Sequence, residues 1–185
     1  MIKVAINGFG RIGKLVFRAI IEKNLKNVQI VAINELGSLE SSLHLVNFDS
    51  THGELKTKLY KSNKGIKYNN KNIIFCSERD PTKLPWKKLG IDVVLECSGV
   101  FASKEKSQSH IIAGAKKVII SAPAKNVDAT IVQGVNNNIL NKKHNIISNG
   151  SCTTNCLAPV AMVLDKVLGI EAGFMTTVHS FTGDQ

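Results

Sequence analysis

The 185-residue sequence has few of the residues that mark secreted or membrane proteins. It contains 4 cysteines and 4 prolines, and aromatic residues make up only 5% of it. The cysteines form no CxxC pair, which argues against a disulfide-stapled scaffold and against a zinc ribbon, so we expect reduced thiols and no metal site. No apolar run reaches the roughly 18 residues that cross a bilayer, and residues 1–4 lead into an alternating strand rather than a secretory leader. We expect a cytoplasmic globular protein without a membrane partner.

Arginine is also scarce, although the formal net charge is +10. Arg11, Arg18 and Arg79 are the only arginines, and the lysines are spread over the whole chain. Binding of nucleic acid calls for clustered cations with interleaved aromatic residues, and the sequence has neither. We therefore do not expect nucleic acid as a partner. A non-catalytic, nucleic-acid-binding protein is the alternative, and tight, salt-sensitive RNA binding without enzymatic activity would favour it.

The first 33 residues read as one βαβ unit. Residues 2–6 alternate and are rich in branched side chains, as in a strand. Apolar residues recur every three or four positions over residues 11–23, which predicts a helix with one buried face, and residues 28–33 form the next strand. Such units build parallel sheets with right-handed crossovers.

Sheet-forming runs continue to alternate with helical and polar segments up to about residue 150. We expect strands at 91–97, 118–120, 130–135 and 146–147, short strands within 56–75 around Asn69-Asn70, a polar loop at 47–53 and a helix at 103–113. This order predicts an α/β fold in which residues 1–150 form a Rossmann-type, doubly wound, mostly parallel sheet.

The pattern changes after residue 150. Residues 152–168 read as a long helix opened by Ser151, and Pro159 inside it should bend it. Residues 174–178 read as a strand. We expect residues 151–185 to begin a second, α+β catalytic domain.

A glycine motif joins the first strand to the first helix. Residues 8–13, Gly-Phe-Gly-Arg-Ile-Gly, fit the G-x-G-x-x-G pattern, whose glycines let the backbone approach a pyrophosphate at the start of a helix. Glu35, at the end of the second strand, would accept hydrogen bonds from the adenosine ribose. The alternative is a tight glycine turn with an unrelated surface glutamate.

The same carboxylate bears on the choice of cofactor. NADP carries a phosphate on the hydroxyl that Glu35 would bind, and two negative groups repel each other unless a cation lies between them. Neither Asn34 nor Leu36 is basic. We therefore expect NAD.

A cysteine at the start of the long helix is the candidate nucleophile. Cys152 would lie in the first turn, where the helix dipole and free amide groups lower the pKa of a thiol. Cys156 falls one turn later, and we expect it on the same face but deeper. A buried structural cysteine is the alternative, but the polar residues around Cys152 argue against it.

His179 is the candidate base, because a histidine paired with a cysteine activates the thiol and exchanges protons with the substrate. The spacing of the two residues does not establish that they meet, and a merely solvated histidine remains the alternative. The other histidines show no comparable partner and are interpreted as surface or structural residues: His44, His52, His110 and His144.

Five segments together resemble the glyceraldehyde-3-phosphate dehydrogenase family, in its bacterial, phosphorylating form. They are Ile6-Asn7-Gly8-Phe9-Gly10-Arg11-Ile12-Gly13, Asp49-Ser50-Thr51-His52-Gly53, Ala113-Gly114-Ala115-Lys116-Lys117-Val118, Ser151-Cys152-Thr153-Thr154-Asn155-Cys156 and Thr176-Thr177-Val178-His179-Ser180. The resemblance covers essentially the whole chain, as the N-terminal portion of such an enzyme.

The resemblance implies roles for individual residues. Cys152 would be the nucleophile and His179 its base, in an oxidation of glyceraldehyde 3-phosphate by NAD that passes through a hemithioacetal and a thioester and ends, with inorganic phosphate, in 1,3-bisphosphoglycerate. The residues implied to contact NAD are Asn7, Gly8, Gly10, Arg11, Ile12, Glu35, Arg79 and Ser121. Those implied to hold the substrate or the attacking phosphate are Ser151, Thr153 and Thr182. The family also implies a homotetramer.

Three features depart from the family pattern. Glu35 replaces an aspartate and is shared with the related erythrose-4-phosphate dehydrogenases, which leaves that activity as an alternative, although residues 121–123 and 182–185 favour the glycolytic enzyme. Gly150 replaces an alanine and allows the backbone more conformations. Family members are much longer, so we expect these 185 residues alone to bind NAD weakly and to show little turnover.

Overall fold

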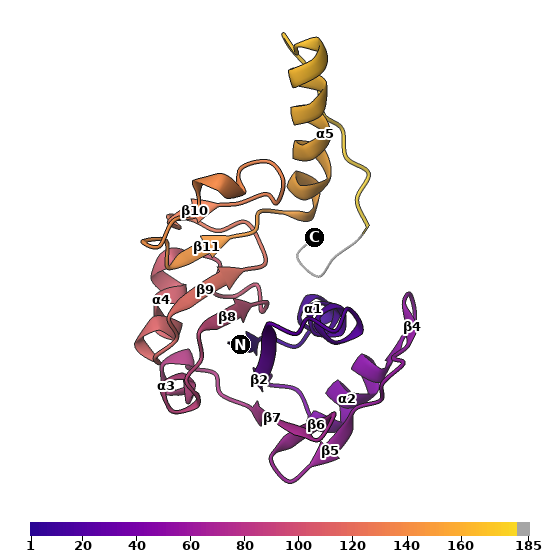
Figure 1. Cartoon of the computed structure of the whole chain (residues 1–185), viewed down its shortest axis with the longest axis vertical. Coiled ribbons are helices and arrows are strands. Elements are labelled where there is room, and N and C mark those ends of the chain that lie inside the picture. Colours follow the sequence, from indigo (N-terminus) through magenta and orange to yellow (C-terminus); the bar gives the residue numbers. More distant parts are fainter. Residues whose placement is uncertain (181–185) are drawn as a thin grey trace.

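A nine-stranded sheet forms the centre of the structure, a computed structural model that describes residues 1–180 (Figure 1). The strand order is β10-β11-β9-β8-β1-β2-β7-β6-β5. All pairs from β10 to β7 are parallel, and β7, β6 and β5 form an antiparallel meander at one edge. The predicted doubly wound, mostly parallel sheet is confirmed.

Strands and helices alternate along the chain except between α2 and α3, where five strands follow one another, and between β9 and β11, where no α-helix intervenes. The strands are β1 (Ile2–Asn7), β2 (Val28–Asn34), β3 (Phe48–Asp49), β4 (Gly53–Glu54), β5 (Tyr60–Ser62), β6 (Gly65–Tyr68), β7 (Lys71–Cys76), β8 (Val93–Glu96), β9 (Lys117–Ile120), β10 (Ala129–Thr130) and β11 (Ile146–Ser148). The helices are α1 (Arg11–Glu22), α2 (Leu39–Asn47), α3 (Trp86–Leu89), α4 (Lys104–Ile112) and α5 (Cys152–Leu168), with short 3-10 turns at Pro81–Lys83 and Asn137–Ile139.

Strand β1 lies between β2 and β8, so the winding of the sheet reverses there. The chain passes from β1 to β2 on one side, and β8 pairs in parallel with the other side. Ligands of doubly wound folds bind at such a switch point, beyond the carboxyl ends of the strands. The loops after β1, β2, β7, β8 and β9 therefore meet at the edge where a nucleotide is expected.

Two hydrophobic cores lie on the two faces of the sheet. Successive residues of β1 alternate between them, with Ala5 in the core beside Trp86 and Ile6 in the core beside Phe17. This alternation follows from the period of two in a strand. Helices α1 and α2 cover one face and α3 and α4 the other (Figure 1). The helix predicted at residues 11–23 is confirmed, but its buried face includes Phe17 and not Ile12, which the apolar repeat placed there and which is exposed.

Helix α5 extends away from the sheet (Figure 1). It runs from Cys152 to Leu168 with Ser151 as its N-cap, as predicted, and it continues through Pro159. The bend at Pro159 stays a prediction. The expectation that Cys156 lies deeper than Cys152 is wrong, because both thiols are exposed.

Two predicted strands are wrong or too long. Only Ala129 and Thr130 pair with β11 in place of residues 130–135, because the Asn136 side chain binds the Val132 N–H at 2.8 Å and the Thr130 carbonyl at 3.0 Å and closes a turn. Residues 174–178 are exposed and form no strand, since no other described segment offers them a hydrogen-bonding edge.

Three elements between residues 39 and 54 are not predicted by the hydrophobic periodicity. Helix α2 has only nine residues, too few for a clear helical repeat. The predicted polar loop at 47–53 contains the two-residue strand β3 and the first residue of the two-residue strand β4, and the two strands pair with each other.

Gly114, after α4, provides a test of the packing between α3 and α4. Its φ is +104°, and a Cβ added there would lie 2.5–2.8 Å from the backbone and Cβ of Lys87. We predict that Gly114→Ala lowers the free energy of unfolding by about 3–5 kcal/mol, because the two helices must separate. Gly134→Ala is the matched control: its φ is +83° but its Cβ would meet nothing within 4 Å, so backbone strain alone costs about 1–2 kcal/mol. Denaturant unfolding measures both, and equal losses would contradict the packing argument.

Candidate active site

The turn between β1 and α1 accepts only glycine at two positions. Gly8 has φ +85°, and a Cβ on it would lie 2.5 Å from the Ser98 backbone nitrogen. A Cβ on Gly13 would lie 2.1 Å from the Gly8 carbonyl oxygen. The backbone is therefore packed as tightly as a phosphate-binding glycine turn requires. Gly10 caps α1 without a side-chain hydrogen bond, so no side-chain cap competes for the amide groups of the first turn.

The Glu35 carboxylate lies directly beside this turn. It accepts hydrogen bonds from the backbone N–H groups of Phe9 at 2.6 Å, Leu36 at 2.7 Å and Gly37 at 3.0 Å. Its partial burial raises the pKa of the carboxyl, but these N–H donors and nearby Lys14 outweigh burial, so the pKa lies below the ordinary value. Glu35 is therefore an anion at neutral pH, as the predicted hydrogen bonds from ribose hydroxyls would require.

The other predicted cofactor residues follow the carboxyl ends of neighbouring strands. Arg11, whose guanidinium bonds Asp49 at 2.6 Å, and Ile12 are exposed at the start of α1. Arg79 is exposed in the segment after β7. Ser121 follows β9 and is half-buried, and its N–H donates to the Glu96 carbonyl at 3.0 Å. Their shared edge of the sheet is the feature that a dinucleotide site needs.

Asn7 differs from these residues, because its side chain is buried. Its amide nitrogen donates to Glu96 at 2.6 Å, and its amide oxygen accepts from Asn34 at 2.8 Å. The Asn7 side chain is therefore occupied within the sheet, and its contact with NAD stays a prediction.

A network of hydroxyl groups shapes the start of α5. The Ser151 hydroxyl accepts from the Thr154 N–H at 2.9 Å and lies 2.8 Å from the Thr153 hydroxyl. Gly150, just before, has φ +69°, a left-handed conformation that an alanine would adopt only under strain. The glycine at this position therefore serves a defined backbone conformation rather than looseness. Thr182, the third predicted phosphate-binding residue, lies outside the described residues.

The structure brings Cys152 and His179 together. The Cys152 sulfur lies 3.1 Å from His179 Nε2, and His179 Nδ1 lies 2.6 Å from the Ser180 carbonyl oxygen. Nδ1 therefore carries a proton, and Nε2 is left to take the thiol proton. The hydrogen bond to His179 lowers the pKa of Cys152, and the same bond raises the pKa of His179. Both shifts favour a thiolate–imidazolium pair, the reactive form of a cysteine nucleophile.

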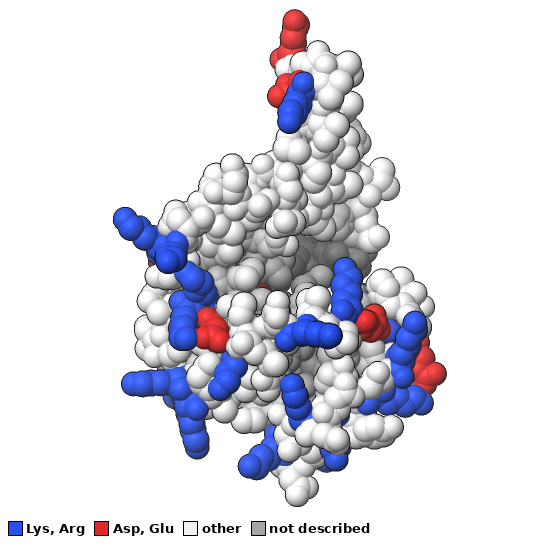
Figure 2. Space-filling view, viewed as in Figure 1, with Lys and Arg blue, Asp and Glu red and all other residues white. Residues whose placement is uncertain are grey.

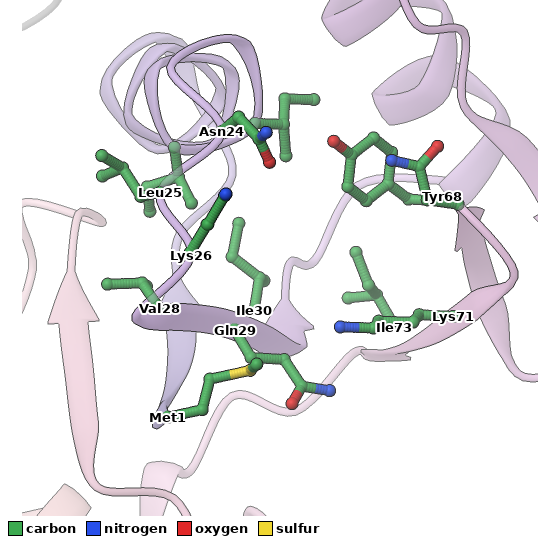
Figure 3. A pocket seen from close by; sticks show the side chains of 13 residues that line it. Met1, Asn24, Leu25, Lys26, Val28, Gln29, Ile30, Tyr68, Lys71 and Ile73 are labelled. Carbon is green, nitrogen blue, oxygen red and sulfur yellow. The ribbon is translucent and has the colours of Figure 1, made fainter.

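A hollow of about 530 Å³ surrounds this pair. Its lining includes Cys156 and Val160 from α5 and Met175 from the segment before His179. A second hollow of about 300 Å³ lies at the opposite, amino-terminal edge of the sheet, between Leu25, Ile30 and Tyr68 (Figure 3). The second hollow holds none of the predicted site residues.

Among the remaining histidines, His110 is a structural residue, in agreement with their interpretation as surface or structural residues. Its partners are not predicted from the sequence: it is fully buried and bonded to Glu96 and Trp86. The signal in the sequence was Glu96 itself, a lone charged residue that ends an otherwise apolar strand.

The described residues show neither a membrane helix nor a metal cluster. None of the helices up to residue 180 combines the length and apolar character of a membrane span. In the same range, no three His, Cys, Asp or Glu side chains meet in a way that could hold a metal ion. Lysine and arginine side chains are scattered on the face shown in Figure 2 rather than gathered in a patch, in line with the interpretation of the charge as dispersed.

Comparison with known proteins fits this arrangement. The family model "Glyceraldehyde 3-phosphate dehydrogenase, NAD binding domain" matches residues 2–104, and the model of the C-terminal domain of the same enzymes matches residues 151–185. The chain belongs to the glyceraldehyde-3-phosphate dehydrogenase family. The glycine turn and Glu35 thus lie in that family's NAD-binding domain, and Cys152 and His179 in the segment that matches its C-terminal domain.

Curated relatives carry the same name. Proteins called glyceraldehyde-3-phosphate dehydrogenase from Xanthobacter flavus, Pseudomonas aeruginosa and Zymomonas mobilis are 51%, 50% and 52% identical to the chain. Each match covers 100% of this chain and 55% of the relative. The chain therefore spans just over half the length of these family members.

The contact between Cys152 and His179 predicts the reactivity of the thiol. In a Cys156→Ser background, which leaves one exposed cysteine among those described, iodoacetamide should alkylate Cys152 at a lower pH than an ordinary thiol, because the pKa of Cys152 is lowered. His179→Asn should move the pH profile of the alkylation rate upward. Mass spectrometry of labelled peptides measures it. Cys97, whose pKa burial raises to about 11, is the internal slow-reacting control, and an unchanged profile in His179→Asn would contradict the pairing.

Proposed function

We propose that the protein is an NAD-dependent oxidoreductase of glycolysis that converts glyceraldehyde 3-phosphate and inorganic phosphate to 1,3-bisphosphoglycerate. The observation that carries the proposal is the 3.1 Å contact between the Cys152 sulfur and His179 Nε2. It adds a nucleophile and its base to a family NAD-binding domain. We further propose residues 1–150 as the NAD-binding domain and residues 151–185 as the beginning of the catalytic domain.

The NAD-binding residues fit the cofactor in shape and charge. Gly8 and Gly10 would let the backbone approach the pyrophosphate, because Gly8 lets the turn pack directly on the Ser98 backbone and no side chain on Gly10 occupies the open space beside it. Arg11 and Ile12 would line it, and the Glu35 anion would accept from the ribose hydroxyls. Residues further along the same edge, Arg79 and Ser121, complete the proposed contacts. NAD, when bound, supplies the acceptor for the hydride that the substrate loses.

Cys152 forms the covalent bond. His179 Nε2 takes the thiol proton, and the thiolate adds to the aldehyde carbon while the carbonyl oxygen takes the proton from His179. The product is a hemithioacetal on Cys152. When its carbon gives up a hydride, His179 takes back the hydroxyl proton and a thioester remains. Inorganic phosphate then attacks the thioester carbon and Cys152 leaves as a thiolate.

Hydroxyl groups beside Cys152 are the proposed phosphate ligands. The Ser151 and Thr153 oxygens lie 2.8 Å apart at the positive end of the α5 dipole, which favours anions. We assign Thr182 to the same role on the family resemblance. The complete protein is proposed to be a cytoplasmic homotetramer, as the resemblance implies, and its four free cysteines are compatible with a reducing compartment.

Erythrose 4-phosphate is the competing substrate, suggested by Glu35. The names of the relatives favour glyceraldehyde 3-phosphate. The ratio of kcat/KM for the two aldehydes, measured on the complete protein, decides between them, and a higher value for erythrose 4-phosphate would overturn the substrate assignment.

Substitutions of Cys152 and of His179 should lower activity to different extents. We predict that Cys152→Ser reduces NAD- and phosphate-dependent oxidation of glyceraldehyde 3-phosphate to background, because the hydroxyl is a far weaker nucleophile at neutral pH. His179→Asn should lower kcat by about 10²–10⁴-fold, the usual contribution of general acid–base catalysis. Absorbance at the NADH band follows both reactions. Cys156→Ser is the matched control and should retain activity, and turnover in Cys152→Ser would refute the covalent route.

Glu35 should determine the preference for NAD over NADP. We predict that Glu35→Gln raises the ratio of kcat/KM for NADP to that for NAD by about tenfold, because it removes the charge that repels the extra phosphate, a difference of about 1.4 kcal/mol. Glu40→Gln is the control: it removes an exposed carboxylate of α2 that pairs with Lys61, and it should leave the ratio unchanged. A ratio that does not move in Glu35→Gln would show that another group sets the preference.

A further inference from the structure

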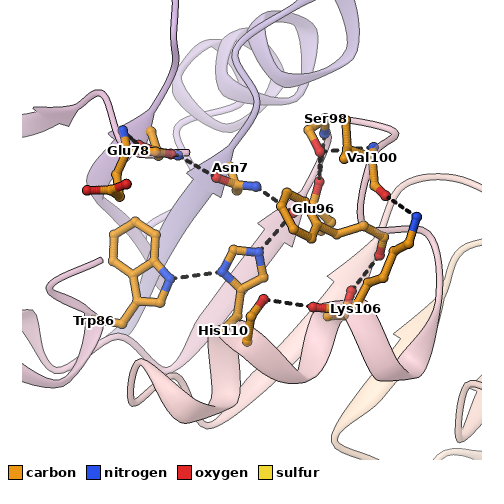
Figure 4. Close-up of polar contacts among 12 residues, drawn as sticks. Asn7, Glu78, Trp86, Glu96, Ser98, Val100, Lys106 and His110 are labelled. Atoms are coloured by element: carbon orange, nitrogen blue, oxygen red, sulfur yellow. Dashed lines mark hydrogen bonds and ion pairs between the residues drawn. The ribbon is translucent and has the colours of Figure 1, made fainter. Parts of the chain in front are cut away.

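A buried polar chain crosses the sheet directly beneath the proposed cofactor edge (Figure 4). Asn34, Asn7 and Glu96 are the last residues of the adjacent strands β2, β1 and β8 and lie side by side in register. His110 from α4 and Trp86 from α3 extend the chain on one side, and the backbone of residue 78 ends it on the other. The side chains of the row are nearly or fully inaccessible to solvent, so its hydrogen bonds cannot be replaced by water.

The two ends of this chain determine the direction of its hydrogen bonds. The Asn34 amide donates to the Glu78 carbonyl at 2.9 Å and accepts from the Glu78 N–H at 2.9 Å, so its orientation is defined by the backbone. The same nitrogen donates to the Asn7 oxygen at 2.8 Å. Asn7 must therefore present its NH₂ group to Glu96, to which it donates at 2.6 Å.

At the other end of the chain, Trp86 and His110 also require Glu96 to accept a hydrogen bond. The Trp86 indole nitrogen is only a donor, and it lies 3.1 Å from His110 Nδ1. His110 Nδ1 is therefore an acceptor, and the proton of this neutral ring is on Nε2, which donates to Glu96 at 2.9 Å. A positively charged His110 would place two N–H groups against each other.

The turn after β8 supplies the remaining hydrogen-bond partners of the Glu96 carboxylate. The Ser98 N–H donates to Glu96 Oε1 at 2.8 Å, and the Ser98 hydroxyl, which accepts from the Val100 N–H at 3.1 Å, donates its own proton to the same oxygen. All four partners of the Glu96 carboxylate are thus donors, and none is a cation. Only an ionised carboxylate, which accepts with both oxygens, satisfies them.

We propose that Glu96 is a positioning residue for the dinucleotide: its buried anion ties Asn7, the residue before Gly8, to the Ser98 turn on which Gly8 packs. Gly8 has no freedom to adjust, because a Cβ there would already lie 2.5 Å from the Ser98 nitrogen. A shift of Glu96 therefore moves Asn7 and the Ser98 turn, the two segments that flank Gly8, together. The inference rests on the proposed use of NAD and extends it to a residue that does not touch the cofactor.

Glu96→Gln in the complete protein tests this role. The substitution keeps the shape of the side chain but sets an NH₂ donor against donors. We expect the Kd for NAD, from calorimetric titration, to rise by about tenfold, the factor that corresponds to about 1.4 kcal/mol, and the KM for NAD to rise while kcat and the alkylation of Cys152 stay near their original values. An unchanged Kd in folded Glu96→Gln overturns the proposal.

A second substitution restores the match at one contact. In Asn7→Asp/Glu96→Gln the donor and acceptor exchange places, and the carboxylate introduced at position 7 still offers an acceptor to Asn34. We expect this double variant to recover most of the NAD affinity. The NMR signal of the Trp86 indole N–H, assigned by its loss in Trp86→Phe, should be shifted from its original position in both Glu96→Gln and the double variant, because His110 opposes an NH₂ group in each. Failure to recover affinity would assign Glu96 a merely structural role.

Two controls separate the possible failures. Asn47→Asp is a matched exchange of one atom at another buried site, where Asn47 binds only the Leu59 backbone, and it should lower stability without changing the Kd for NAD. If Glu96→Gln does not fold, Ser98→Ala removes one donor at the rim, and an unchanged Kd in that variant overturns the proposal. Original protein that does not bind NAD refutes the proposed function instead, before any variant is compared.

Discussion

The parallel pairing of β1 with β2 on one side and β8 on the other is the constraint on which the site depends. It places Asn7, Asn34 and Glu96 in one row at the ends of three strands. Three segments of the candidate site continue directly from this row. The glycine turn continues from Asn7, Glu35 follows Asn34, and the Ser98 turn follows Glu96. Because the backbones of Gly8 and Ser98 are in contact, the turn that would receive the pyrophosphate has a single arrangement.

The sequence predicted the elements whose signals are local. Strand β1, helix α1 and the Ser151 cap each depend on neighbours a few positions away, and these elements are confirmed. The buried face of α1 is not, because Ile12 of the apolar repeat is exposed while Phe17 is buried. Residues 130–135 and 174–178 are apolar enough for strands, but strand formation also depends on a pairing edge, and side chains such as Asn136 compete for the same backbone groups. Such competition leaves no trace in hydrophobic periodicity.

The site was predictable in its residues but not in its contacts. The chemistry of Cys152 and His179 identifies them as candidates, yet they are 27 positions apart in the sequence, and only the fold places their side chains 3.1 Å apart. The link between Glu96 and His110 is not predicted, because Glu96 stands out as a lone charge at the end of an apolar strand but no sequence pattern identifies its partner. The role of this contact depends on the direction of every hydrogen bond between Trp86 and Glu78, and the sequence does not contain those directions.

The two edges of the large sheet have a consequence for the behaviour of the folded domain in a crowded solution. One edge strand, β10, has two residues, and the other, β5, has three. In β5 the central residue is Lys61, whose ammonium group pairs with Glu40 on α2. So little unpaired backbone, with a charge beside it, offers a poor template to another strand. A sheet of nine strands can thus stay free of strand-mediated polymerisation without closing into a barrel.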